Sequence, residues 1–216
     1  MNWTVETRTA TVDAILLRAP VLPVLAIDKL EHALPLARAL IAGGLPVLEI
    51  TLRTKVALEV IALLARECPD ACIGAGTVLN EGDLEAVVQA GAAFAIAPGT
   101  TRKLYGAAAA CPIPFIPAVA TASEVMEGMD QGHRRFKFFP AVPMGGIATL
   151  KAFAGPFAGV KFCPTGGITA ETAPQFRALS NVVTVGGSWM APPAIVEHGK
   201  WDGIEQLARA CSKAAS

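Results

Sequence analysis

Short apolar runs recur along the chain at intervals of about 20–28 residues, and each is bounded by glycine, proline or polar residues. Continuous apolar runs of this length are typical of strands that are buried on both faces of a sheet. The pattern therefore predicts eight strands. The runs are VLPVLAI (21–27), LPVLEITL (45–52), CIGAGTV (72–78), AFAIAP (93–98), IPFIPAV (113–119), FKFFPA (136–141), GVKFCPT (159–165) and VVTVGGS (182–188).

Between these runs, apolar residues recur at i, i+3 and i+4, which predicts amphipathic helices over 29–42, 55–68 and 81–90. Glycines at 43–44 and 91 follow two of them, as expected at helix C-termini. Strands that alternate with helices indicate a parallel sheet, since parallel strands need crossover connections.

Eight such repeats in 216 residues fit a (β/α)8 TIM barrel, an α/β fold. An open doubly wound sheet is the alternative, but no GxGxxG motif follows the first strand. We expect a single barrel domain over residues 1–216. The segment before residue 20 is predicted to form an N-terminal helix that closes the bottom of the barrel.

Composition excludes several classes of partner. Apolar residues make up 53% of the chain and charged residues 17%, which supports a large core rather than disorder. Eighteen basic residues balance eighteen acidic ones, so the chain lacks the basic surface that nucleic acids or anionic membranes require. The N-terminal segment has no signal-peptide pattern, and no apolar run reaches the length of about 18 residues that a membrane span needs. We expect a cytoplasmic protein.

The cysteines and histidines predict no cross-link or metal site. The five cysteines form no CxxC pair, and an odd number does not suggest a disulfide framework. Free thiols fit a reducing compartment. The three histidines lie in no HxH or HExxH pattern, so we expect no metal.

Charged residues inside apolar strands are the first candidates for chemistry, because a buried charge is costly unless it is paired. Lys137 lies between Phe136 and Phe138. An amine held among aromatic rings is desolvated, which favours the neutral nucleophile that forms a Schiff base with a ketone. The alternative is a lysine that extends to solvent or pairs with a carboxylate. Lys161 occupies a similar place in the next strand, and the pattern leaves both lysines open as the nucleophile.

Glu49 is a carboxylate within a strand run, and it suits either general acid–base catalysis or a salt bridge. Arg53, near the end of the same run, offers a fork that matches a carboxylate, although it would suit the surface equally well. The glycine pairs in PTGGIT (164–169) and VGGSW (185–189) end the last two strands. Barrels often bind phosphate there through backbone N–H groups and a helix N-terminus, while a lone GG usually marks only a turn.

Five motifs together carry a family resemblance. In their order and spacing they closely resemble the 2-keto-3-deoxy-6-phosphogluconate (KDPG) aldolases, class I aldolases of the Entner–Doudoroff pathway. The resemblance runs from about residue 15 to residue 210. The motifs are VLEITLRT (47–54), GAGTVL (74–79), FKFFPA (136–141), FCPTGGI (162–168) and VGGSW (185–189).

The resemblance implies an enzyme that cleaves KDPG to pyruvate and glyceraldehyde 3-phosphate. It also implies cleavage of 4-hydroxy-2-oxoglutarate (KHG) to pyruvate and glyoxylate. The partners would be keto-acid and sugar-phosphate substrates, with no cofactor, and the chain would form a homotrimer. An isomerase or epimerase barrel and a non-catalytic sugar-phosphate binding barrel are the alternatives.

The resemblance also assigns the site residues. Lys137 is the Schiff-base lysine and Glu49 the acid–base group, while Lys161 is an ordinary basic residue. Arg53 and Thr77 would bind the carboxylate. The remaining substrate-binding residues, of which the last four would hold the phosphate, are Pro98, Phe139, Thr165, Gly166, Gly167, Gly187 and Ser188.

Two further features bear on the substrate. The stretch PAVATASE (117–124) departs from the glycine and serine that many relatives carry near PGIST, and a change in that loop would alter substrate fit. The LRT and FCPTGGI stretches favour a gluconate-derived substrate over a galactonate-derived one.

Overall fold

The computed structural model describes residues 3–18 and 20–213, and the remaining residues of the predicted 1–216 domain lie outside this description. Within the described residues, each of the eight apolar runs forms a strand, and the fifth run is divided in two. The strands are β1 (Val21–Leu25), β2 (Val47–Thr51), β3 (Cys72–Gly76), β4 (Phe94–Ile96), β5 (Phe115–Ile116), β6 (Ala118–Val119), β7 (Arg135–Phe138), β8 (Lys161–Pro164) and β9 (Val185–Gly187).

Helices connect the strands, and the three predicted amphipathic helices form as α2, α3 and α4. Gly44 and Gly91 follow α2 and α4 with φ of +92° and +86°, a left-handed conformation that suits glycine at a helix end. The helices are α1 (Val5–Leu16), α2 (Leu30–Ala42), α3 (Ala57–Glu67), α4 (Glu81–Gln89), α5 (Arg102–Ala110), α6 (Ala122–Asp130), α7 (Gly146–Ala154), α8 (Ala173–Arg177), α9 (Pro193–Glu197) and α10 (Trp201–Lys213).

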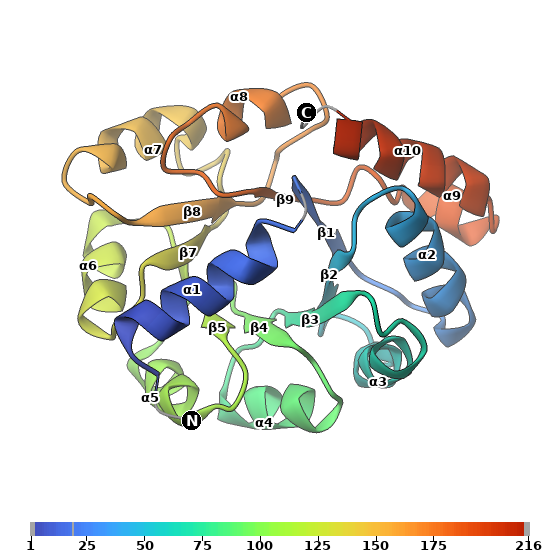
Figure 1. Ribbon diagram of the computed structural model, residues 1–216, viewed down its shortest axis with the longest axis horizontal. Coiled ribbons are helices and arrows are strands. Elements are labelled where there is room, and N and C mark those ends of the chain that lie inside the picture. Colours follow the sequence, from blue (N-terminus) through green and yellow to red (C-terminus); the bar gives the residue numbers. More distant parts are fainter. Residues whose placement is uncertain (1–2, 19, 214–216) are drawn as a thin grey trace.

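The strands form a closed parallel ring. One sheet has the order β5-β4-β3-β2-β1-β9 and the other the order β6-β7-β8. Isolated bridge pairing between Thr165 and Gly186 joins β8 to β9, and β6 follows β5 directly in the chain. Figure 1 shows the ring at the centre of the molecule, with helices around its outside. The predicted (β/α)8 barrel is therefore confirmed, and the doubly wound alternative is wrong.

Proline explains the break in the fifth strand. Pro117 separates β5 from β6 and has no N–H to donate to a neighbouring strand. The hydroxyl of Thr100 accepts a hydrogen bond from the amide of Ala118 at 3.1 Å, which satisfies a donor beside the break. The chain thereby changes its pairing from β4 to β7 within a few residues.

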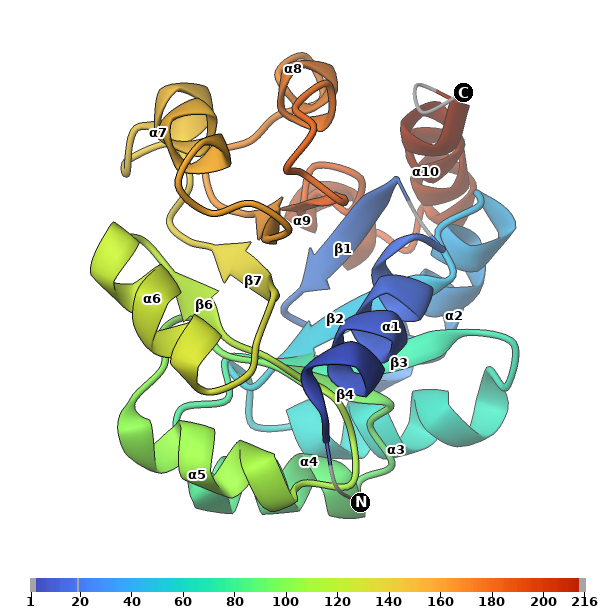
Figure 2. The same cartoon turned by 60° about the vertical axis from the view of Figure 1, so that its left-hand side comes forward.

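Helix α1 closes one end of the barrel, as predicted (Figures 1 and 2). The Asp13 carboxylate accepts two hydrogen bonds, at 2.5 and 2.6 Å, from Arg135 at the start of β7. Arg18 donates to the carbonyl of Asp70 before β3, and the Trp3 indole donates to the carbonyl of Cys111 before β5. These contacts lie at the N-terminal ends of the strands, so the C-terminal ends form the open mouth.

All five cysteines are free and buried. Across residues 3–18 and 20–213, no helix combines the length and the apolar character needed to cross a membrane. The single-domain organisation and the cytoplasmic location remain predictions.

A buried cationic contact attaches α1 to the barrel. Arg8 Nη1 lies 2.7 Å from His133 Nε2 and donates to the carbonyl of Gln131 at 2.9 Å. Burial, followed by the positive charges of Arg8 and Arg134, lowers the pKa of His133 to about 3. The ring is therefore neutral at ordinary pH, and Nε2 can accept the hydrogen bond from Arg8.

This depressed pKa predicts acid sensitivity. Between about pH 6.5 and pH 3 the unfolded chain binds a proton at His133 that the folded chain does not bind. Stability should therefore fall as the pH drops below about 6.5, by up to about 1.4 kcal/mol per pH unit from this residue. Urea unfolding at pH 7 and pH 5 should show a smaller loss for His133→Gln, whose amide oxygen can still accept from Arg8. Equal losses in the two proteins would exclude His133 as the source.

Candidate active site

Lys137 and Glu49 meet inside the barrel, from strands that lie opposite one another in the ring. Lys137 Nζ donates to Glu49 Oε1 at 2.8 Å. The side chains are only 6% and 1% exposed, so each charge has lost its water and depends on the other. The two charges that stood out within apolar runs of the sequence, Lys137 and Glu49, thus form one buried ion pair.

The structure separates the two candidate lysines. Lys161 is exposed at the first position of β8, where it pairs in register with Arg135 at the end of the barrel that α1 covers. Lys137 lies two positions further along its own strand and points into the interior. Only Lys137 has an amine in a desolvated setting beside a carboxylate.

The predicted reason for desolvation is wrong in one respect. Successive residues along a strand point to opposite faces of the sheet. Phe136 and Phe138, which flank Lys137 in β7, therefore point away from its amine. Their rings pack with Phe162, at centroid distances of 6.2 and 6.4 Å. The barrel interior desolvates the amine instead, together with the Phe139 ring, whose centroid lies 5.4 Å from Nζ.

Glu49 keeps one oxygen free. Oε1 accepts from Lys137, while Oε2 is buried and has no hydrogen-bond partner within the described part of the chain. Buried polar atoms are nearly always satisfied, and an exception calls for an explanation. A free carboxylate oxygen beside an amine is suited to exchange protons with a ligand bound between them.

Cys163 borders this pair and was not a candidate from sequence. It is the register partner of Lys137 on the neighbouring strand. Burial raises the pKa of its thiol to about 12, with Glu49 raising it further and Lys137 opposing the shift. The thiol therefore stays neutral, fills space beside the ion pair and adds no charge to it.

Arg53 is held by a residue that the sequence analysis missed. Its Nε donates to the Thr51 hydroxyl at 3.0 Å, and that hydroxyl donates to the carbonyl of Leu25 at 2.8 Å. Thr51 is buried and lies two positions after Glu49, on the same face of β2. A polar residue two positions beyond a buried carboxylate was the signal in the sequence. The terminal nitrogens of Arg53 form no hydrogen bond with the described residues and are available to an anion.

Thr77 has an unusual backbone. Its φ of +62° makes it the one non-glycine residue with positive φ in the described ranges. For a β-branched residue this conformation is strained, at a cost on the order of 1–3 kcal/mol. Thr77 directly follows β3 at the open mouth, where its predicted role is to bind a carboxylate.

The loop after β8 exposes amides. Gly166 and Gly167 have φ of +105° and +79°, which only glycine adopts readily. Their N–H groups donate to no carbonyl in the described chain, and they follow the buried Thr165 at the open mouth. The expected helix N-terminus is absent here, because α8 begins only at Ala173 and is five residues long. A phosphate would depend on the loop amides without a helix.

Gly187 is required by packing, whereas Ser188 is exposed to a cleft at the barrel mouth. A Cβ on Gly187 would lie 1.8 Å from the Trp189 ring, so packing alone requires glycine there. Ser188 is exposed, and it lines a cleft of about 330 Å³ together with Arg53. Lys29 and His32, which follow the first strand and were not candidates, line the same cleft.

The two other predicted binding residues lie at the open mouth. Pro98 is half-buried and lies two residues after β4, and Phe139 directly follows β7. The C-terminal ends of the strands thus carry every predicted site residue except the two that pair within the barrel.

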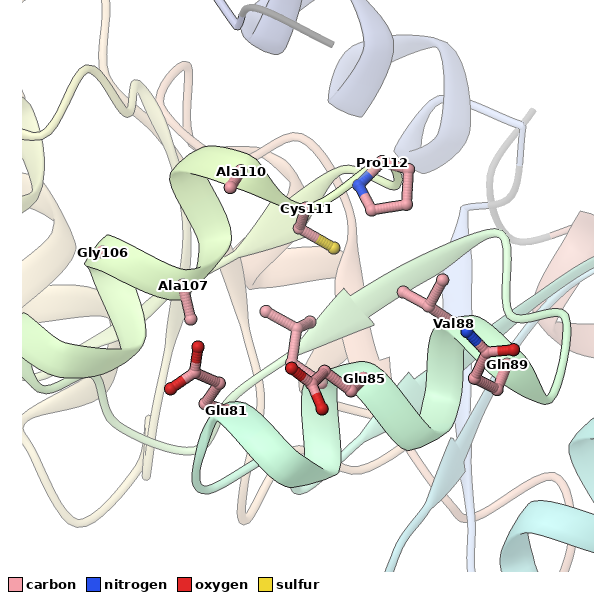
Figure 3. A pocket seen from close by; sticks show the side chains of 10 residues that line it. Glu81, Glu85, Val88, Gln89, Gly106, Ala107, Ala110, Cys111 and Pro112 are labelled. Atoms are coloured by element: carbon pink, nitrogen blue, oxygen red, sulfur yellow. The ribbon is translucent and has the colours of Figure 1, made fainter.

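A larger groove lies elsewhere, between α4 and α5 on the outside of the barrel (Figure 3). It has a volume of about 580 Å³ and is lined by apolar side chains together with the polar side chains of Glu81, Glu85 and Gln89. None of the predicted site residues lines it. Its lining contains no lysine amine beside a carboxylate, so the barrel mouth is the better candidate for chemistry.

The comparisons agree on one family. The model of the KDPG and KHG aldolase family matches residues 12–207. The 2-dehydro-3-deoxy-phosphogluconate aldolase of Dickeya dadantii is 52% identical over 208 residues, which cover 96% of this chain and 95% of the relative. The KHG/KDPG aldolase of Escherichia coli K12 is 50% identical over the same shares of the two chains.

Solved structures share the fold closely. A KDPG aldolase from Legionella pneumophila, with pyruvate captured as a covalent carbinolamine intermediate, is 50% identical with a TM-score of 0.91. The match covers 93% of this chain and 97% of that one. The Zymomonas mobilis enzyme with 3-phosphoglycerate is 45% identical with a TM-score of 0.87, covering 93% and 94% of the two chains.

Proposed function

Because the chain belongs to the KDPG and KHG aldolase family, we propose that it cleaves KDPG to pyruvate and glyceraldehyde 3-phosphate through a Schiff base on Lys137. The buried contact of 2.8 Å between the Lys137 amine and Glu49 carries this proposal. The E. coli relative is named for both substrates, and we extend the proposal to cleavage of KHG to pyruvate and glyoxylate.

The ion pair prepares the nucleophile. Transfer of a proton from Lys137 Nζ to Glu49 leaves a neutral amine at the centre of the barrel. The amine attacks C2 of the keto acid to form a carbinolamine. Glu49 then returns its proton to the departing hydroxyl, which leaves as water to give the protonated imine and the ionised carboxylate. The carbinolamine captured in the L. pneumophila relative supports this first step.

The imine then acts as an electron sink. Glu49 takes the proton of the C4 hydroxyl, for which its unpaired Oε2 is available. The electron pair of the C3–C4 bond moves into the imine, which releases glyceraldehyde 3-phosphate and leaves a pyruvate enamine on Lys137. The same carboxylate returns the proton to C3, and water hydrolyses the imine to release pyruvate.

The ends of the substrate meet different loops in this proposal. The free guanidinium nitrogens of Arg53, with Thr77, bind the pyruvate carboxylate. The amides of Gly166 and Gly167, with Gly187 and the Ser188 hydroxyl, bind the phosphate; the positive φ of the first two glycines supports this assignment. Thr165, Phe139 and Pro98 line the space between.

The family resemblance also supports a homotrimer, and the free cysteines fit a cytoplasmic location; both remain proposals. An isomerase, an epimerase and a non-catalytic binding barrel have no comparable support. Neither an isomerase nor a binding protein requires a buried amine paired with a carboxylate. Trapping of a covalent adduct distinguishes the aldolase from all three.

Lys137 should form that adduct. Incubation with pyruvate and borohydride, followed by peptide mass mapping, should label Lys137 in the parent protein and in Lys161→Met. Lys137→Met should lose both labelling and cleavage, with its fold checked by circular dichroism. Label on Lys161 in the parent protein would show that Lys161, and not Lys137, is the nucleophile.

Ser188→Ala should mainly raise KM for KDPG. The hydroxyl would contact only the phosphate, so we expect a rise of roughly 10- to 100-fold, as for loss of one hydrogen bond to a charged group, with kcat nearly unchanged. KHG carries no phosphate and serves as the matched control substrate. Equal losses on KDPG and KHG would place the phosphate elsewhere.

Glu49→Gln should lower kcat for cleavage by about 10²–10⁴-fold, the usual range for general acid–base catalysis, with KM little changed. It should also slow exchange of the pyruvate methyl protons in deuterium oxide, since that exchange passes through the same enamine. Proton NMR of pyruvate with each protein measures the rate. If Glu49→Gln exchanges these protons at the parental rate, Glu49 is not the group that transfers the proton at C3.

A further inference from the structure

Gly76, the last residue of β3, lies directly against the Glu49 carboxylate. A Cβ at this position would be 2.2 Å from Glu49 Oε1, 2.7 Å from Cγ and 2.8 Å from Cδ. Real Cβ atoms do not approach other heavy atoms so closely, so any side chain at position 76 would displace Glu49. Oε1 is the oxygen that accepts from Lys137 at 2.8 Å.

Backbone conformation does not require glycine at this position. Gly76 lies in the regular β3 ladder opposite Thr51 and is not among the residues with positive φ. Other residues adopt that conformation freely. The demand for glycine therefore comes from the space that Glu49 occupies.

The displaced group would be the carboxylate rather than the strand. Gly76 is fixed by the β2–β3 ladder, and its carbonyl accepts from the Leu52 amide at 2.9 Å. Glu49 has a flexible end, so its carboxylate would rotate before the ladder breaks. Rotation would disturb both the contact with Lys137 and the direction of Oε2.

We propose that Gly76 is a positioning residue: its missing side chain leaves the space that holds the Glu49 carboxylate with Oε1 on Lys137 and Oε2 free for the substrate. The proposal deepens the function proposed above and rests on it. A misplacement of about 1 Å in a catalytic group can cost on the order of 10²-fold in rate. Gly76 would act on the reaction only through Glu49.

Gly76→Ala tests this role. Methyl-proton exchange of pyruvate in deuterium oxide should slow by about 10- to 100-fold, while KM for pyruvate changes by less than about 3-fold. Rates are divided by the amount of Lys137 that borohydride traps at equilibrium, which counts only chains that form the imine. A parental exchange rate per trapped chain would overturn the proposal.

The Glu49→Ala background separates positioning from general damage. With the carboxylate removed, the added methyl group has space, so Gly76→Ala should change the exchange rate by less than about 2-fold there. It should lower the melting temperature of the parent protein but not that of Glu49→Ala. The same fold-loss in both backgrounds would show that Gly76 does not act through Glu49.

Gly74→Ala is the matched control on the same face of β3, where the new Cβ would lie 2.2 Å from the Phe94 ring instead. Its exchange rate per trapped chain should stay within about 2-fold of the parent. Slowing equal to that of Gly76→Ala would overturn the specific role of Gly76. Failure of the parent protein to trap pyruvate would contradict the proposed function itself, which keeps the two outcomes distinct.

Discussion

The ion pair between Lys137 and Glu49 is the constraint on which the rest of the site depends. Two charges with almost no exposure persist inside an apolar barrel only while they face each other at hydrogen-bond distance. That distance requires β2 and β7 to stand opposite one another in a closed ring. It also requires Gly76 to leave room for the carboxylate. Closure of the barrel is thus a condition for the chemistry as well as for the core.

The two ends of the barrel use charge in different ways. At the end covered by α1, Arg135 is fully engaged by Asp13 and by backbone carbonyls, and Arg8 has His133 and Gln131. At the open mouth, Arg53 is held through one nitrogen only, and Glu49 keeps an unpaired oxygen. Polar groups whose hydrogen bonds are made within the protein stabilise the fold, whereas the free groups at the mouth are able to bind a ligand.

The strands could be predicted well from the sequence, because a strand that is buried on both faces consists of a continuous apolar run. Lys137 and Glu49 were likewise visible as charges within such runs. The choice between Lys137 and Lys161 was not, since both lie in apolar runs and only the structure shows which one is exposed. Thr51 and Gly76 escaped for a related reason, since their roles arise from contacts across strands. Thr51 is marked along its own strand only as a polar residue two positions after Glu49, and the space beside Gly76 has no signature along β3.

The site also separates positioning from packing among its glycines. Gly76 leaves room for the Glu49 carboxylate, Gly186 leaves room for the Thr165 hydroxyl, and Gly187 leaves room for the Trp189 ring. None of these three needs a positive φ, in contrast to Gly166 and Gly167. Glycine in a barrel strand is therefore best interpreted by what its missing Cβ would strike. Where that neighbour is a reacting group, the empty volume belongs to the active site as much as any side chain does, because it fixes where the reacting atoms can stand.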